Sequence, residues 1–265
     1  RKDNMKVFSV IGVSKSGKTT TIENIIKELK RRSYTVGSIK EIHYEKFAID
    51  EEGTNTYRHR KAGSDLVTAR GYHETDILFP RNLDIDKILK FYSQDYVIME
   101  GVVDYNCPII LCVNKKEDIE ENRNKEYFER IFLISGVISN KINEYDGIPV
   151  INSKNNIEKL VDFIEQKVYR ILPDFPPECC GECSFSCREL GVRILKGLAK
   201  VDDCILTKAK VKLFVNGRKI GMVPFVQNIL KDCIKAIIKN LKGCEDVKKI
   251  ELIEVRSLIR IVYCV

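Results

Sequence analysis

Short apolar runs alternate with amphipathic stretches over residues 1–172. Met5–Ile11 is an apolar run of strand length. The residues after it repeat apolar side chains at helical spacing, at Ile22, Ile25, Ile26 and Leu29. A further strand-like run, 95–101, ends in Glu100-Gly101. Strands that alternate with helices favour βαβ units. We therefore predict an α/β fold with a mainly parallel sheet for residues 1–172.

The pattern changes twice towards the C-terminus. Residues 173–206 begin with the proline-rich PDFPPE and contain a group of cysteines. In residues 207–265, apolar and polar positions alternate up to Asn216-Gly217, which is typical of a tight hairpin turn. A helix should follow and end at Gly243, with one apolar stripe formed by Ile229, Leu230, Cys233, Ile234, Ile237, Ile238 and Leu241. The segments 248–255 and 258–265 are predicted strands. We expect a small cysteine-rich segment and a small α+β domain behind the first domain.

Composition narrows the class of protein. Hydrophobic residues make up 44% of the 265 and charged residues 31%. No apolar run reaches the roughly 18 residues that span a bilayer, and no secretory leader is visible, so we expect a cytoplasmic protein with no membrane contact. The net charge of +7 is dispersed among many acids, which argues against a nucleic-acid partner. Because the cytoplasm keeps thiols reduced, clustered cysteines there more often bind metal than form disulfides.

The first apolar run leads directly into GVSKSGKT, residues 12–19. This is the full G-x-x-x-x-G-K-[ST] phosphate loop between a strand and a helix, and an ordinary glycine turn is the weaker alternative. Its backbone N–H groups and the helix N-terminus favour phosphate oxygens. Lys18 would reach the β and γ phosphates, and the Thr19 hydroxyl would ligate Mg²⁺. The predicted nucleotide-binding residues are Gly12, Ser14, Lys15, Ser16, Gly17, Lys18, Thr19 and Thr20.

Glu100 is the predicted acidic partner of this loop. It ends a buried strand, and the carboxyl ends of parallel strands face the ligand crevice. With Lys18 it forms the predicted catalytic pair, either holding Mg²⁺ or orienting a nucleophile; a simple capping acid is the alternative. Asn114-Lys115 is similar to the N-K-x-D element that reads guanine, but Glu117 occupies the fourth position and Asp118 comes one residue later. A plain charged loop remains the stronger interpretation of that stretch.

Residues 40–63 indicate which family of phosphate-loop proteins the chain resembles. KEIHYEKFAIDEEGTNTYRHRKAG, residues 40–63, carries Arg58, His59 and Arg60 on one turn, either as anion donors or as an exposed basic helix start. With Glu100-Gly101, this stretch resembles the molybdopterin-guanine dinucleotide biosynthesis protein B (MobB) family over roughly residues 5–170. Matching positions are Lys40, His43, Phe47, Asp50, Gly53, Tyr57, Arg58, His59, Arg60, Ala62 and Gly63. Lys40, His43, Arg58 and Arg60 are the candidate anion or cofactor contacts.

The resemblance implies GTP binding with slow hydrolysis, in support of attaching GMP to molybdopterin. A separate guanylyltransferase, the A protein of that pathway, would perform the transfer, and it or a molybdoenzyme would be the protein partner. The sequence does not give the oligomeric state, and a homodimer is one assembly open to the chain. The chain would be an accessory protein of molybdenum or tungsten cofactor synthesis. Two alternatives remain open: a nucleotide-dependent carrier of iron–sulfur or metal clusters, and a small-molecule kinase.

The cysteine group is ECCGECSFSC, residues 178–187. Cys180 and Cys183 form a C-x2-C, Cys187 follows closely, and Cys204 lies beyond a predicted helix. Zinc sites usually pair their cysteines in two knuckles, so this spacing favours an iron–sulfur cluster over zinc or over buried or oxidised thiols. The stretch resembles the four-cysteine [4Fe–4S] module of corrinoid iron–sulfur proteins. Cys179 would be spare, and the remaining cysteines would be core residues: Cys107, Cys112, Cys233, Cys244 and Cys264.

Overall fold

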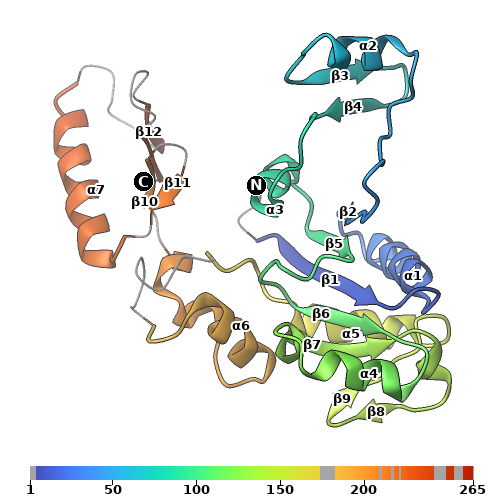
Figure 1. The fold of residues 1–265 in the computed structure, drawn as a ribbon. Helices are drawn as coiled ribbons and strands as arrows, with labels where there is room; N and C mark the ends of the chain where they lie inside the picture. The colour runs from blue at the N-terminus through green and yellow to red at the C-terminus, as the bar shows by residue number, and fades with distance from the viewer. Residues whose placement is uncertain are drawn as a thin grey trace.

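A parallel sheet of five strands forms the centre of the computed structural model (Figure 1). The structure describes residues 4–173, 183–208, 211–215, 218–220, 222–241, 249–253 and 259–264. Within the sheet the strand order is β2-β5-β1-β6-β7, and each neighbouring pair is parallel. The strands are β1 (Lys6–Gly12), β2 (Val36–Lys40), β5 (Tyr96–Glu100), β6 (Ile109–Cys112) and β7 (Ile131–Ser135). The predicted α/β fold is confirmed.

Helices cover both faces of this sheet. On one face, α1 (Lys18–Arg31) and α5 (Ile157–Lys167) pack against Phe8 and Val10 of β1. On the other face, α4 (Lys116–Arg123) buries Ile119 near Ile11. Alternate residues of β1 therefore enter different cores, as the period of two in a strand requires. Short helices connect the strands: α3 (Ile85–Ile88), η1 (Leu89–Phe91), η2 (Phe128–Arg130) and η3 (Val137–Asn140).

Residues 41–80 leave the sheet as a projecting unit, drawn at the top of Figure 1. It contains α2 (Asn55–Lys61) and an antiparallel pair, β3 (Val67–Arg70) and β4 (Thr75–Leu78). A second small antiparallel pair joins β8 (Glu144–Tyr145) to β9 (Ile148–Pro149). Val67 is the one buried hydrophobic residue between residues 41 and 80. The alternation of strands and helices did not predict either antiparallel pair.

The helix expected between Cys187 and Cys204 is present as α6 (Cys187–Leu195). Its start is fixed by a capping box, in which Ser186 Oγ accepts from the N–H of Glu189 and the Glu189 carboxylate accepts from the N–H of Ser186. Leu190 and Leu195 join the same hydrophobic cluster as Phe8 of the parallel sheet. Short helices η5 (Val201–Asp203) and η6 (Ile205–Lys208) follow. This segment thus shares its core with the parallel-sheet domain.

The C-terminal residues form a second sheet with antiparallel strands in the order β11-β10-β13-β12. Its strands are β10 (Val211–Val215), β11 (Arg218–Ile220), β12 (Lys249–Ile253) and β13 (Ile259–Cys264). The pairing of β10 with β11 confirms the predicted hairpin. The helix α7 (Pro224–Ile238) ends before the predicted Leu241, and Gly243 lies outside the described residues.

The predicted apolar stripe of α7 is buried only in part, and the prediction that Cys233 is a core residue is wrong. Of the predicted stripe, Leu230, Ile234 and Ile238 pack in a core with Val211 and Met222. The others are exposed: Ile229, Cys233, Ile237 and Leu241. A helix touches one sheet over only part of its circumference, so seven apolar positions exceed what this sheet can cover. Cys233 is therefore not a core residue, whereas Cys107 and Cys112 are buried as predicted. Cys244 and the side chain of Cys264 lie outside what the structure describes.

Candidate nucleotide-binding site

The phosphate loop connects β1 to α1 at the carboxyl end of the parallel sheet. Gly12 has φ +145°, and a Cβ there would lie 1.8 Å from the carbonyl oxygen of Cys112 in the neighbouring strand. Only glycine can lie this close to another backbone. Gly17 caps α1 in the left-handed region with φ +88°, and Lys15 at the loop tip has φ 59°. The backbone therefore curls around the N-terminus of α1, as anion binding by N–H groups requires.

Lys18 lies across this loop. Its Nζ donates to the carbonyl oxygens of Gly12 at 2.9 Å and Val13 at 2.6 Å. Ser16 is buried beneath it, and its Oγ also donates to Val13 O, at 2.8 Å. The ammonium charge is thus held over the concave side of the loop. Ser14 and Lys15 are exposed at the tip, and Thr20 is partly buried in the first turn of α1.

Glu100 faces Thr19 across the end of the sheet, as predicted. The Thr19 hydroxyl donates to Glu100 Oε1 at 3.4 Å. Lys40 Nζ donates to the same oxygen at 2.6 Å. Strand register explains the grouping, because Lys40 of β2 pairs with Glu100 of β5, and Glu100 pairs with Val10 just before the loop. The structure brings together three of the predicted site residues, one from each of three elements.

Gly136, which follows β7, is part of the site and was missed from the sequence. It has φ +87°, and a Cβ there would lie 2.4 Å from the carbonyl oxygen of Ser16. The backbone nitrogen and the carbonyl oxygen of Val113 each lie 3.0 Å from the same Cβ position. A glycine directly after the apolar run IFLIS is the signal that could have identified it. Below the loop, burial raises the pKa of the Cys112 thiol to about 12, so this cysteine stays protonated.

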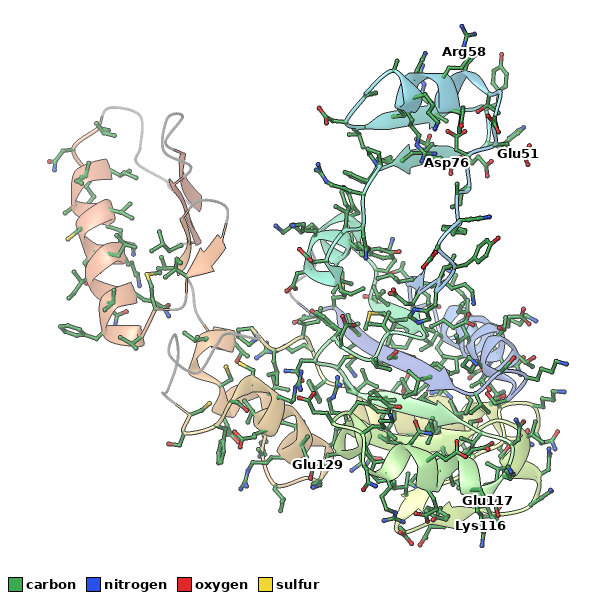
Figure 2. The ribbon with its side chains drawn as sticks, viewed as in Figure 1. Glu51, Arg58, Asp76, Lys116, Glu117 and Glu129 are labelled. Atoms are coloured by element: carbon green, nitrogen blue, oxygen red, sulfur yellow. The ribbon has the colours of Figure 1, made fainter. Side chains whose placement is uncertain are left out.

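In the loop after β6, the carboxylate of Asp118 binds the loop's own backbone and not a nucleotide base. Asp118 Oδ2 accepts from the backbone N–H groups of Asn114 at 2.9 Å and Lys115 at 3.3 Å. Asp118 is buried and caps α4. Glu117 is exposed on that helix next to Lys116 (Figure 2). The structure therefore agrees with a charged, capped loop at this position.

The other predicted anion contacts lie apart from the phosphate loop. Arg58 is on α2 in the projecting unit, at the top of Figure 2. Arg60, on the same turn, pairs with Asp50 at 3.3 Å. Hydrogen bonds led by that from Thr56 lower the pKa of the Asp50 carboxyl. His43 is exposed between β2 and α2. Of the four candidates, Lys40 alone joins the site.

The predicted cluster ligands that the structure describes lie before α6, at its start and after it. Cys183 is partly buried, and its Sγ lies 3.4 Å from the carbonyl oxygen of Phe185. Cys187 is the first residue of α6 and is buried, as is Cys204. Cys180 and Cys179 lie outside the described residues. Among the residues that the structure does describe, no three metal-ligating side chains form a group.

Comparison with known proteins identifies the family. The model of Molybdopterin guanine dinucleotide synthesis protein B (MobB) matches residues 7–134. A protein of Methanocaldococcus jannaschii, named as a candidate molybdopterin-guanine dinucleotide biosynthesis adapter protein, is 30% identical over 255 residues, which cover 94% of this chain and 97% of that protein. The chain belongs to the MobB family. A probable adapter protein of the same name from Bacillus subtilis is 26% identical and covers 60% of this chain and 90% of its own length.

The crystal structure of Bacillus subtilis MobB shows the same fold for the parallel-sheet part. Its TM-score is 0.50 at 21% identity, over 60% of this chain and 98% of that one. The M. jannaschii match covers 94% of this chain and so extends into the cysteine-rich and C-terminal parts, whereas the B. subtilis matches each cover 60% of the chain. In the part of the chain that the structure describes, no helix is long and apolar enough to cross a membrane.

Proposed function

We propose that this MobB-family protein binds a Mg²⁺–nucleoside triphosphate, preferentially GTP, and acts as an adapter with slow GTPase activity. Its role would be to support the formation of molybdopterin guanine dinucleotide in molybdenum or tungsten cofactor synthesis. The observation that carries this proposal is the curled backbone of residues 12–17, which ends in Lys18 and Thr19 opposite Glu100. Guanine preference rests on family membership, since Asp118 is engaged with its own backbone.

The residues present fit a Mg²⁺ site. Thr19 and Glu100 offer a hydroxyl and a carboxylate oxygen, the donor type that Mg²⁺ prefers, and these two atoms are 3.4 Å apart. Two oxygens on adjacent corners of an octahedral Mg²⁺ site lie about 3 Å apart, so a small closure or one intervening water suffices. When bound, Mg²⁺ would neutralise phosphate charge. Lys18 would leave the loop carbonyls for phosphate oxygens, and Glu100 could orient a water molecule.

Slow hydrolysis is consistent with the arginines of the projecting unit. Arg60 is paired with Asp50, and α2, which also carries Arg58, lies apart from the loop (Figure 2). In other phosphate-loop enzymes, an arginine that stabilises the transferred phosphate group raises kcat by a factor of about 10³–10⁵. In this arrangement neither side chain contributes to its own chain's loop, and a partner protein or second copy would be needed for fast turnover.

Nucleotide titration tests the proposal. Isothermal calorimetry with Mg²⁺ should show binding of GTP more tightly than ATP. Lys18→Ala should weaken binding more than about tenfold, because a charge-assisted contact to phosphate is lost. Lys27→Ala, an exposed lysine on the same helix, is the matched control and should leave affinity unchanged. Equal affinities for wild type and Lys18→Ala would reject the loop assignment, and tenfold preference for ATP would favour a cluster carrier. Phosphorylation of a small acceptor would favour a kinase.

For the cysteine segment we propose that Cys180, Cys183, Cys187 and Cys204 ligate one [4Fe–4S] cluster. Support comes from the spacing and from Cys187 lying at a helix start fixed by the Ser186 cap. A cluster would also organise a short segment that begins with prolines. Anaerobic or reconstituted protein should contain about four irons and four sulfides per chain. Each Cys→Ser change at these positions should lower iron content, whereas Cys233→Ser, on the exposed face of α7, should not.

Stoichiometric zinc without iron under the same conditions would reject the cluster. Full iron content in all four serine variants would reject it as well. For the partner, we propose the guanylyltransferase of the pathway or a molybdoenzyme, which co-purification with the nucleotide-bound protein tests. We also propose that the chain forms a homodimer through its own surface, which analytical sedimentation tests.

A further inference from the structure

Lys40 forms a close ion pair with the carboxylate of the candidate site. Its ammonium nitrogen lies 2.6 Å from Glu100 Oε1, the oxygen that the Thr19 hydroxyl approaches at 3.4 Å. The Glu100 side chain is 14% exposed, whereas that of Lys40 is 58% exposed. A flexible, mostly hydrated side chain therefore places its charge on a mostly buried carboxylate.

Stability alone gives a weak account of this pair. Ion pairs with an exposed partner contribute about 0–1 kcal/mol, because water screens them and ordering the side chains costs entropy. The contact matters more for the charge of the site. Without a metal, Glu100 would be an unneutralised carboxylate beside Thr19, and the Lys40 ammonium supplies the positive charge that a bound cation would otherwise provide.

Mg²⁺ and the ammonium group compete for this position. Both are attracted to the same carboxylate group, and two positive charges a few ångström apart repel each other strongly in a partly buried site. The stem of a lysine has four rotatable carbons, so the ammonium can move while the backbone of β2 stays paired with β5. Phosphate oxygens bound next to Thr19 and Glu100 would be the nearest new negative charge.

We propose that Lys40 is an exchangeable cation of the nucleotide site. It neutralises Glu100 in the nucleotide-free protein, and it turns to the terminal phosphate group of a bound nucleoside triphosphate when Mg²⁺ binds beside Glu100. This inference rests on the proposed nucleotide binding and adds a role to it. Lys18 keeps its β-phosphate contact in a diphosphate, whereas Lys40 would lose its whole contact because a diphosphate lacks the terminal group.

The test compares Lys40→Met with Lys87→Met. Lys87 is the matched control: it is 61% exposed and pairs with Asp84 at 2.8 Å, on α3, which precedes the amino end of β5. Binding of Mg²⁺–GTP and Mg²⁺–GDP is titrated for each protein, together with the Mg²⁺ concentration that gives half-maximal GDP binding. Thermal unfolding checks that all three proteins are folded.

In Lys40→Met we expect the ratio of the GDP Kd to the GTP Kd to fall about tenfold, which is the loss of one charge-assisted contact. The half-maximal Mg²⁺ concentration should fall at the same time, since the competing ammonium is gone. If Lys40 only stabilised the fold, its loss would not lower both the Kd ratio and the half-maximal Mg²⁺ concentration. Lys87→Met should match wild type in both.

The outcomes separate the two proposals. If wild type binds both nucleotides but Lys40→Met keeps the wild-type ratio, this inference is overturned and the proposed function stands. If wild type binds neither nucleotide, the proposed function itself fails. A ratio that falls equally in Lys87→Met would show a general charge effect and would also overturn the assignment to Lys40.

Discussion

The guanidinium group of Arg130 donates a hydrogen bond to the carbonyl oxygen of Val103 at 2.7 Å, from a side chain that is 2% exposed. It donates a second to the carbonyl oxygen of Tyr105. Both acceptors lie in the loop that follows Glu100. One buried arginine at the end of η2 thus holds the chain that leaves the candidate metal site.

Arg130→Met should destabilise the protein by about 2–4 kcal/mol, because the buried carbonyl group of Tyr105 and the partly buried one of Val103 lose a charged donor. Urea unfolding of the variant and wild type gives the difference. Arg123→Met removes an arginine whose partners Glu120 and Asp146 are solvent-exposed, so its cost should stay within about 1 kcal/mol. Similar costs for both variants would contradict the role given to Arg130.

Gly136→Ala should weaken nucleotide binding more than about tenfold, because a methyl group 2.4 Å from Ser16 O pushes the phosphate loop out of place. Backbone strain at φ +87° adds to this effect. Gly147→Ala separates the two causes, since Gly147 has φ +77° with no atom within 4 Å of the added Cβ. Calorimetric titration should find near-normal affinity in that control. Normal affinity in Gly136→Ala would show that the loop does not depend on this contact.

Gly191→Ala should destabilise the protein, although alanine is favoured over glycine in a helix by about 1 kcal/mol. Gly191 lies inside α6, and its Cβ would come 2.3 Å from the hydroxyl oxygen of Tyr169. We expect a net cost of about 1–3 kcal/mol from this overlap. In a Tyr169→Phe background the cost should shrink, because the overlapping oxygen is absent. A double-mutant cycle by urea unfolding measures this coupling, and additive costs would refute it.

The free energy of unfolding should decrease as the pH is lowered below 4.5, because the Glu28 carboxylate becomes protonated. Hydrogen bonds from the Arg31 guanidinium lower the pKa of this carboxyl from 4.5 to about 2. A lowered folded pKa means that the stabilisation is present above the unfolded pKa and is lost as pH falls from 4.5 towards 2. Because Arg31 is 61% exposed, water screens the pair, and we expect a loss of about 1–2 kcal/mol.

The check is the difference in free energy of unfolding between wild type and Glu28→Gln, measured at several pH values. It should shrink as the pH is lowered through this window. Glu158, which is 71% exposed, also pairs with Arg31, so Glu158→Gln serves as the control with little effect at any pH. If the difference in free energy of unfolding between wild type and Glu28→Gln did not change with pH, Glu28 would not be a source of the acid sensitivity.

Local patterns in the chain determined the first strand, the phosphate loop and the first helix. The run from Met5 to Ile11, the GVSKSGKT loop and the helical spacing of Ile22, Ile25 and Leu29 each depend on residues close in sequence. Such signals do not need the rest of the fold, so the strand, the loop and the helix were predictable. The same holds for the hairpin between Val215 and Arg218. For Glu100, its place at a strand end was enough to predict that it would face the loop.

Tertiary structure alone decided which distant residues meet. Lys40 joins Glu100 because β2 pairs with β5, a register that neither strand specifies by itself. Gly136 is needed because β7 ends against the phosphate loop, and the exposed half of α7 follows from the width of the sheet beneath it. From the sequence, Arg130 would be expected at the surface, whereas in the fold it is buried and donates to two carbonyl groups. Contacts between residues far apart in sequence are set by how the layers pack, and a periodic pattern records only which side of an element is apolar.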